Sequence, residues 1–181
     1  MSIVLHTQEK FMMAARNAHV IFLDYDGVLH PDAVYLSKQG PSLKADGELF
    51  MWAPALVQLL EEFPSVSLVL STSWVRHLGF KKALGYLPQS MRNKVIGATW
   101  HSSMSREWPD EQTWDGRTRY TQICRYASRA HLQHWLAIDD DASGWPPEAG
   151  KYLIHCVADQ GLGHESTLSS LRRGLEELVA Q

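Results

Sequence analysis

Long hydrophobic runs are absent from this sequence. The longest uncharged apolar stretches, at 20–23 and 67–70, are no longer than a β-strand, whereas a helix that crosses a bilayer needs about 20 apolar residues. The first ten residues include charged side chains and lack the apolar core of a secretory signal. These absences argue against a membrane-spanning or secreted protein and favour a cytoplasmic one.

Cysteine is scarce, and neither sign of charge dominates. The two cysteines, Cys124 and Cys156, lie far apart without a Cys-X-X-Cys or Cys/His spacing, which argues against a zinc site and predicts reduced thiols. The formal net charge is −3, so the overall charge does not demand a nucleic-acid partner. Basic residues between 76 and 94 and between 117 and 129 form either solvated helix faces or a cationic approach for a phosphorylated substrate.

What remains is the profile of one folded domain. The 181 residues are 45% hydrophobic and 20% charged, which suits a single α/β domain. Strands are predicted at 20–23, 66–70, 95–96, 135–138 and 152–157, and helices at 54–63, 77–86, 120–130 and 168–178. Helices between strands predict a Rossmann-like three-layer sandwich with a mainly parallel sheet. We assign 19–181 to this domain, 1–18 to a helical extension and 100–116 to a Trp-rich loop.

Polar clusters follow three of the predicted strands. They are Asp24-Tyr25-Asp26-Gly27, Ser71-Thr72-Ser73 and Asp139-Asp140-Asp141. The carboxyl ends of parallel strands meet at one edge of the sheet, where ligands bind in such folds. Clustered carboxylates repel one another unless a cation lies between them, and oxygen ligands select a hard ion. The sequence therefore predicts a Mg²⁺ site at this edge.

The first cluster also has the parts of a phosphoryl-transfer site. A carboxylate such as Asp24 can attack phosphorus and form an aspartyl-phosphate. A carboxyl two residues further on, at Asp26, can protonate the leaving oxygen and later activate water. Gly27 suits a sharp turn with a positive φ.

These strings resemble motifs of the haloacid dehalogenase (HAD) superfamily. VIFLDYDGVL at 20–29 resembles its first motif, the strand ending at Ser71 resembles its second, and the strand ending in Asp139-Asp140 resembles its fourth. The resemblance implies that Asp24 is the nucleophile and a metal ligand. It also implies that Asp26 is the general acid/base and contributes its backbone carbonyl to the metal, and an Asp here is typical of the superfamily's phosphatases.

The resemblance extends to the phosphoryl and metal ligands. Ser71 would bind the phosphoryl group, with Thr72 as the alternative if the register differs by one. Asp139 would complete the Mg²⁺ site, and Asp140 would hold a metal-bound water. The third motif requires a Lys or Arg, and no Lys lies between positions 94 and 151. We choose Arg119 for this role, with Arg117 as the alternative, because a guanidinium can bind oxyanions through its forked donors.

A narrower resemblance covers most of the chain from position 19. LVLSTSWVR, KVIGAT, an Arg-led helix, WLAIDDD and a late Gly161-Leu162-Gly163 are similar to HAD domains among the Swiss Army Knife RNA-repair proteins. That likeness implies a phosphatase that heals polynucleotide ends. The segment 30–47 is predicted to be a flap or hairpin, too small for a cap domain, and the resulting open site suits a large substrate.

Several alternatives remain open from the sequence. The substrate could instead be a small metabolite or a phosphoprotein, or the chain could be a non-catalytic module that binds phosphate. A dehalogenase is disfavoured, because carbon–halogen cleavage needs neither Asp26 nor the doubled acidic motif. His30, after the first motif, is interpreted as a structural or solvent-facing residue, although it could line the site. Trp74, after the second motif, could pack in the core or stack on a base or ring.

Overall fold

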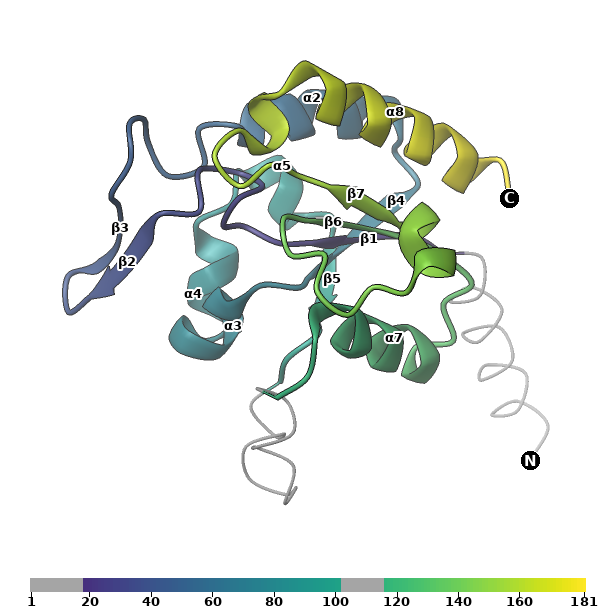
Figure 1. Ribbon diagram of the computed structural model, residues 1–181, viewed down its shortest axis with the longest axis horizontal. Coiled ribbons are helices and arrows are strands. Elements are labelled where there is room, and N and C mark those ends of the chain that lie inside the picture. Colours follow the sequence, from purple (N-terminus) through teal and green to yellow (C-terminus); the bar gives the residue numbers. More distant parts are fainter. Residues whose placement is uncertain (1–17, 102–115) are drawn as a thin grey trace.

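The computed structural model describes residues 18–101 and 116–181, and its centre is a five-stranded sheet (Figure 1). The strand order is β5-β4-β1-β6-β7, and every pair is parallel. The bounds are β1 His19–Leu23, β4 Val66–Leu70, β5 Val95–Ala98, β6 His134–Asp139 and β7 Leu153–His155. The expected α/β sandwich with a parallel sheet is therefore confirmed.

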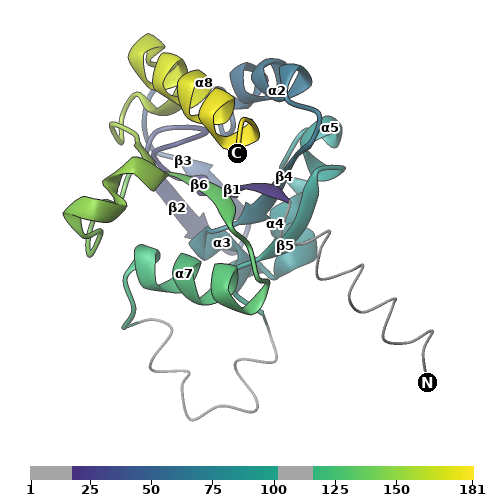
Figure 2. The same cartoon turned by 90° about the vertical axis from the view of Figure 1, so that its right-hand side faces the viewer.

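Helices cover both faces of the sheet. The helix α2 (Ala53–Glu62) and the carboxyl-terminal α8 (Glu165–Val179) lie on one face, and α7 (Arg119–Arg129) lies on the other (Figures 1 and 2). Alternate residues of β1 point to opposite faces, as the pleat requires. Ile21 and Leu23 belong to the larger core, whereas Val20 and Phe22 join the smaller core under α7.

One predicted helix is wrong. The segment expected as a single helix at 77–86 lies in two short helices, α3 (Ser73–Leu78) and α4 (Phe80–Gly85). Gly79 between them has φ 84°, a conformation that costs glycine little and ends the first helix. A further short helix, α5 (Gln89–Arg92), precedes β5 and was not predicted.

The flap expected at 30–47 is an antiparallel hairpin. Its strands β2 (Val34–Ser37) and β3 (Gly40–Leu43) pair with each other and stand apart from the main sheet (Figure 1). Two short 3₁₀ helices, η2 (Pro147–Tyr152) and η3 (Gly161–Gly163), flank β7. Leu162 of η3 donates its N–H to the Val28 carbonyl, which anchors the loop after β1.

Two predicted segments lie mostly outside the described residues. They are the helical extension at 1–18 and the Trp-rich loop at 100–116. Among the described residues, both cysteines are free thiols. No helix of the described part is long and apolar enough to cross a membrane.

Candidate active site

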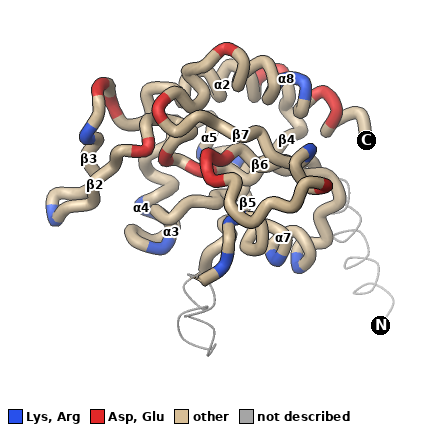
Figure 3. The backbone as a smooth tube through the Cα atoms, in the orientation of Figure 1, with Lys and Arg blue, Asp and Glu red and all other residues tan. Residues whose placement is uncertain are grey.

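The carboxyl ends of β1, β4 and β6 bring the polar clusters together. β1 lies between β4 and β6, and its last residue pairs with Leu70 on one side and Ile138 on the other. The residues that follow these positions, Asp24, Ser71 and Asp139, therefore leave neighbouring strands at the same edge. The backbone tube shows acidic positions gathered at this end of the sheet (Figure 3).

Arg119 bridges two of these aspartates. It is the first residue of α7, and its Nη2 donates to Asp24 Oδ2 at 3.1 Å while its Nε lies 2.9 Å from Asp139 Oδ2. The side chains of Asp24 and Asp139 are buried, with exposed fractions of 5% and 1%, and that of Arg119 is largely covered, with an exposed fraction of 14%. The structure thus brings Arg119, our first choice for the third motif, into contact with Asp24, the predicted nucleophile.

Burial and mutual repulsion raise the pKa values of the acidic cluster. Burial raises the pKa of Asp139 to about 9, and the charge of Asp24 adds to the rise while Arg119 opposes it. Burial raises the pKa of Asp140 to about 6, again with a contribution from Asp24. The pKa of Asp24 is also raised, chiefly by burial. One guanidinium therefore does not neutralise the cluster, and the charges call for a second cation.

Three carboxylates have the arrangement that such a cation needs. Ligand atoms of Asp24, Asp139 and Asp140 all lie within 4.8 Å of one another. Asp139 Oδ2 is buried, and apart from its ion pair with Arg119 Nε it has no hydrogen-bond partner among the described residues. These oxygen donors fit a hard divalent ion such as Mg²⁺. Gly27, with φ 66°, lets Asp140 approach, because a Cβ there would overlap the Asp140 carboxyl.

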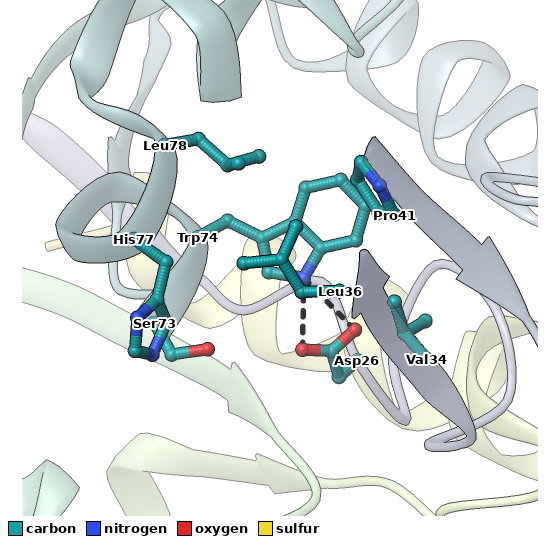
Figure 4. Close-up of a pocket in the computed structure, with 8 residues that line it drawn as sticks. All are labelled: Asp26, Val34, Leu36, Pro41, Ser73, Trp74, His77 and Leu78. Atoms are coloured by element: carbon teal, nitrogen blue, oxygen red, sulfur yellow. Dashed lines mark hydrogen bonds between the residues drawn. The ribbon is translucent and has the colours of Figure 1, made fainter. Parts of the chain in front are cut away.

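The side chain of Asp26 is not part of this group of carboxylates and is bound by two neighbours. The Trp74 indole Nε1 donates to its carboxylate, at 3.0 Å from Oδ1 and 2.9 Å from Oδ2 (Figure 4). The His30 Nε2 lies 3.0 Å from Oδ1. Since His30 Nδ1 accepts the N–H of Phe50 at 3.3 Å, a neutral His30 carries its proton on Nε2 and donates it to Asp26.

Trp74, which donates to Asp26, belongs to a cluster of packed aromatic rings. The Trp74 ring packs against the rings of Tyr25, Phe50 and Tyr86 at centroid distances of 5.6, 5.4 and 5.1 Å. Tyr25 is fully buried between the two aspartates of the first motif, and its hydroxyl donates to the carbonyl of Ala83. Packing on several sides leaves the indole N–H little freedom to turn from Asp26.

The two hydroxyl candidates lie beside Asp24. Ser71 is fully buried, and its Oγ has no hydrogen-bond partner within the described ranges. The Thr72 Oγ1 accepts the N–H of Trp74 at 3.3 Å and so caps α3, and a hydrogen bond of its side chain lowers the pKa of Asp24. Both hydroxyls can serve an oxyanion here, and the choice between them stays a prediction.

The sequence predicted which residues come together but not the two side chains that bind Asp26. Asp24, Asp139, Asp140 and Arg119 lie close together as expected, while the side chain of Asp26 is not part of the candidate metal site. Trp74 packs in the core, which was one of its two interpretations, and His30 is buried and not solvent-facing; both also bind Asp26. For His30, a separation of four residues from Asp26 was an available signal. Trp74 is 48 residues away from Asp26 in the sequence, and no feature of the sequence indicated their contact.

The fold and the site together define a class. A parallel α/β sheet with an Asp-X-Asp-Gly turn after its central strand and paired aspartates after the neighbouring strand is the arrangement expected of a HAD-type protein. The family model described as "HAD domain in Swiss Army Knife RNA repair proteins" matches residues 20–167. The chain belongs to this family, which confirms the resemblance and supports the expectation of a HAD-type phosphatase.

Other comparisons add little. No curated protein sequence gave a significant match. A 3-deoxy-D-manno-octulosonate 8-phosphate phosphatase structure from Yersinia pestis has 12% identity and a TM-score of 0.39, covering 94% of this chain and 89% of that one. A structure assigned to the HAD superfamily (subfamily III A) hydrolases, from Legionella pneumophila, has 11% identity and a TM-score of 0.35, covering 98% and 92%. At these scores the assignment rests on the family match.

Proposed function

We propose that the chain is a Mg²⁺-dependent phosphomonoester hydrolase that acts through an aspartyl-phosphate on Asp24. The observation that carries this proposal is the surroundings of Asp24. Arg119 donates to one of its oxygens at 3.1 Å, and atoms of Asp139 and Asp140 lie within 4.8 Å. Membership of a HAD family supports the same class of reaction.

In the proposed reaction an Asp24 oxygen attacks phosphorus while the bond to the leaving oxygen breaks. Protonated Asp26 gives its proton to that oxygen, and the resulting carboxylate takes a proton from the water that hydrolyses the aspartyl-phosphate. Arg119 and the hydroxyls of Ser71 and Thr72 would stabilise the phosphoryl oxygens. Bound Mg²⁺, held by the aspartates, would offset the negative charge of the phosphoryl oxygens. The products are an alcohol and inorganic phosphate.

The favoured substrate is a nucleotide or a polynucleotide end. Two observations support it: the family is that of HAD domains in RNA repair proteins, and the flap after the first motif is only a two-stranded hairpin. A small hairpin leaves room for a large substrate. A small metabolite or a phosphoprotein is the alternative, and the cytoplasmic setting expected from the reduced cysteines belongs to the same proposal.

The decisive variant is Asp24→Asn, with Asp159→Asn as a control at an exposed acidic position. Each protein is assayed for phosphate release from phenyl phosphate, with Mg²⁺ and with EDTA. We expect wild type and Asp159→Asn to be active with Mg²⁺ alone and Asp24→Asn to lose turnover while its circular dichroism spectrum stays unchanged. Equal turnover by Asp24→Asn would refute the nucleophile assignment, and undiminished activity in EDTA would refute the metal requirement.

A further inference from the structure

A groove leads away from Asp26 between the β2–β3 hairpin and helices α3 and α4 (Figure 4). Its inner part, of about 260 Å³, begins at Asp26, and its outer part, of about 540 Å³, reaches the tip of the hairpin. Leu36, Pro41, His77 and Leu78 line both parts, so the two are continuous. We call this feature the hairpin groove.

The inner part of the hairpin groove is a mainly apolar slot with a carboxylate at one end. Val34, Leu36 and Pro41 come from the hairpin side, Trp74 and Leu78 come from α3, and Ser73 and His77 of α3 add polar groups to the same wall (Figure 4). The leaving oxygen of the substrate must reach Asp26 if that residue protonates it. The remainder of the leaving group then continues into the slot, where apolar walls favour the faces of a ring over a chain of hydroxyls.

The outer part has a different chemistry. Lys38 at the hairpin tip and Lys82 of α4 both line it, together with Tyr86, whose ring is 39% exposed. The basic positions at the hairpin tip and along α3 and α4 are visible on the backbone tube (Figure 3). Because the whole chain has a net charge of −3, this positive charge is a local feature of the groove.

We propose that the hairpin groove binds the leaving strand of a single-stranded polynucleotide end. The terminal nucleoside lies in the apolar slot, and the next phosphodiester lies between Lys38 and Lys82. An ammonium binds phosphate as a point charge, and exposed aromatic rings such as Tyr86 provide stacking faces for bases. The inference rests on the proposed function, and it adds which part of the substrate is recognised beyond the ester that is cleaved.

The regularly spaced phosphates of a polynucleotide distinguish it from the other possible ligands of the hairpin groove. A polynucleotide carries a phosphate at every nucleotide, so when one nucleoside fills the slot a second phosphate is available to the lysines of the outer part. A nucleoside monophosphate or a sugar phosphate has no second phosphate for them. A phosphopeptide lacks both the regular charge and the base that an apolar slot with aromatic edges accommodates.

The test measures binding and does not depend on turnover. In the Asp24→Asn background, fluorescence anisotropy gives the affinity for a labelled, end-phosphorylated hexanucleotide at several salt concentrations. The test variant adds Lys38→Ala and Lys82→Ala. The control adds Lys151→Ala and Arg173→Ala, which remove the same charge at exposed positions outside the groove.

The expected difference follows from counterion release. Each phosphate that is neutralised on a single strand contributes a slope of about −0.7 to log K against log salt, and Lys38 and Lys82 share one phosphodiester, so together they contribute about −0.7. Between 50 and 200 mM salt, the parent should therefore lose about 2.6-fold more affinity than the Lys38/Lys82 variant. The control should keep the parent slope. Equal slopes in parent and test variant would overturn the proposal.

Two further experiments distinguish ligand binding in the hairpin groove from hydrolysis at Asp24. A phosphopeptide of matched charge should bind more weakly than the hexanucleotide, and equal, lysine-dependent binding of the peptide would overturn the nucleic-acid assignment. With Asp24 restored, the Lys38/Lys82 variant should hydrolyse phenyl phosphate like wild type and lose activity only on oligonucleotides. Loss on both substrates would overturn the groove assignment, whereas inactive wild type with intact lysine-dependent binding would count against the proposed hydrolase alone.

Discussion

The hydrogen bond from Trp74 to Asp26 allows a direct test of the proposed acid/base role of Asp26. Trp74→Phe keeps an aromatic ring in the cluster but removes the N–H that lies 3.0 and 2.9 Å from the two carboxylate oxygens. His30 would remain as the second donor at 3.0 Å. The variant therefore loosens the carboxyl without removing it, and Asp24, Arg119 and the metal ligands are untouched.

The size of the effect follows from the lost hydrogen bond. A hydrogen bond to a charged group contributes about 1.5–3 kcal/mol, and each 1.36 kcal/mol in the barrier changes a rate tenfold. If the whole loss appears in the transition state for proton transfer, the rate falls by roughly 10- to 150-fold. General acid catalysis as a whole contributes about 10²- to 10⁴-fold, so the loss stays within what the acid can supply.

The assay compares two leaving groups of similar shape. Phenolate, whose conjugate acid has a pKa near that of tyrosine at about 10, needs a proton as it leaves, whereas 4-nitrophenolate is a far better leaving group and needs little help. The kcat/KM value reports the first phosphoryl transfer and excludes hydrolysis of the aspartyl-phosphate. We expect Trp74→Phe to lower kcat/KM for phenyl phosphate by at least about tenfold and to leave that for 4-nitrophenyl phosphate within about threefold.

A matched substitution controls for packing. Trp135→Phe changes the same residue type in an aromatic group under the opposite face of the sheet, where Trp135 contacts Phe22 and Tyr152. It should lower the melting temperature without distinguishing the two substrates. An equal fall of kcat/KM for both substrates in Trp74→Phe, or no fall for phenyl phosphate, would refute the role given to the Trp74–Asp26 contact.

Two further predictions concern the charges of the site. Arg119→Lys should lower kcat by roughly tenfold or more, because one ammonium cannot reproduce the contacts of Nη2 with Asp24 and of Nε with Asp139; steady-state kinetics at saturating Mg²⁺ would detect this, and an unchanged kcat would contradict it. Without a divalent ion, the free energy of unfolding should fall as pH rises from about 4 to 9. The raised pKa of Asp139, about 9 against an ordinary value of 3.8, means that the folded state binds more protons than the unfolded chain in this window. Mg²⁺ binds the ionised carboxylates, so the rise in melting temperature that it causes should be larger at pH 8 than at pH 6, and an equal rise at both values would contradict this account.

The central sheet was predictable because its strands are short, apolar and bounded by clear signals. β4 was expected at 66–70 and lies there, since Pro64 precedes it and polar residues from Ser71 follow it. The pair α3 and α4 was not predictable in the same way. Apolar spacing runs through Gly79, and only the backbone reveals that this glycine adopts φ 84° and divides the segment.

The same contrast holds for the active site. Asp24, Asp139 and Asp140 were predictable because residues that follow adjacent parallel strands must meet, whatever the loops do. Arg119 required an additional assumption about where α7 begins. The Trp74–Asp26 contact depends on the direction of a side chain in the first turn of α3, and sequence periodicity contains no information about that direction across 48 residues.

The two aspartates of the first motif are bound by different groups of residues, on different sides of the site. Asp24 is bound by Arg119 on the side of the acidic cluster, whereas Asp26 is bound by Trp74 and His30 on the side of the hairpin. Tyr25 between them is fully buried, which fixes both carboxyls relative to the core. In the proposed reaction, the residues that hold the phosphoryl group are therefore separate from those that meet the leaving group. If the hairpin groove binds the leaving strand as proposed, substitutions at 34–41 or in α4 should change which strand is accepted without disturbing the phosphoryl side, because no residue of the acidic cluster lines the groove.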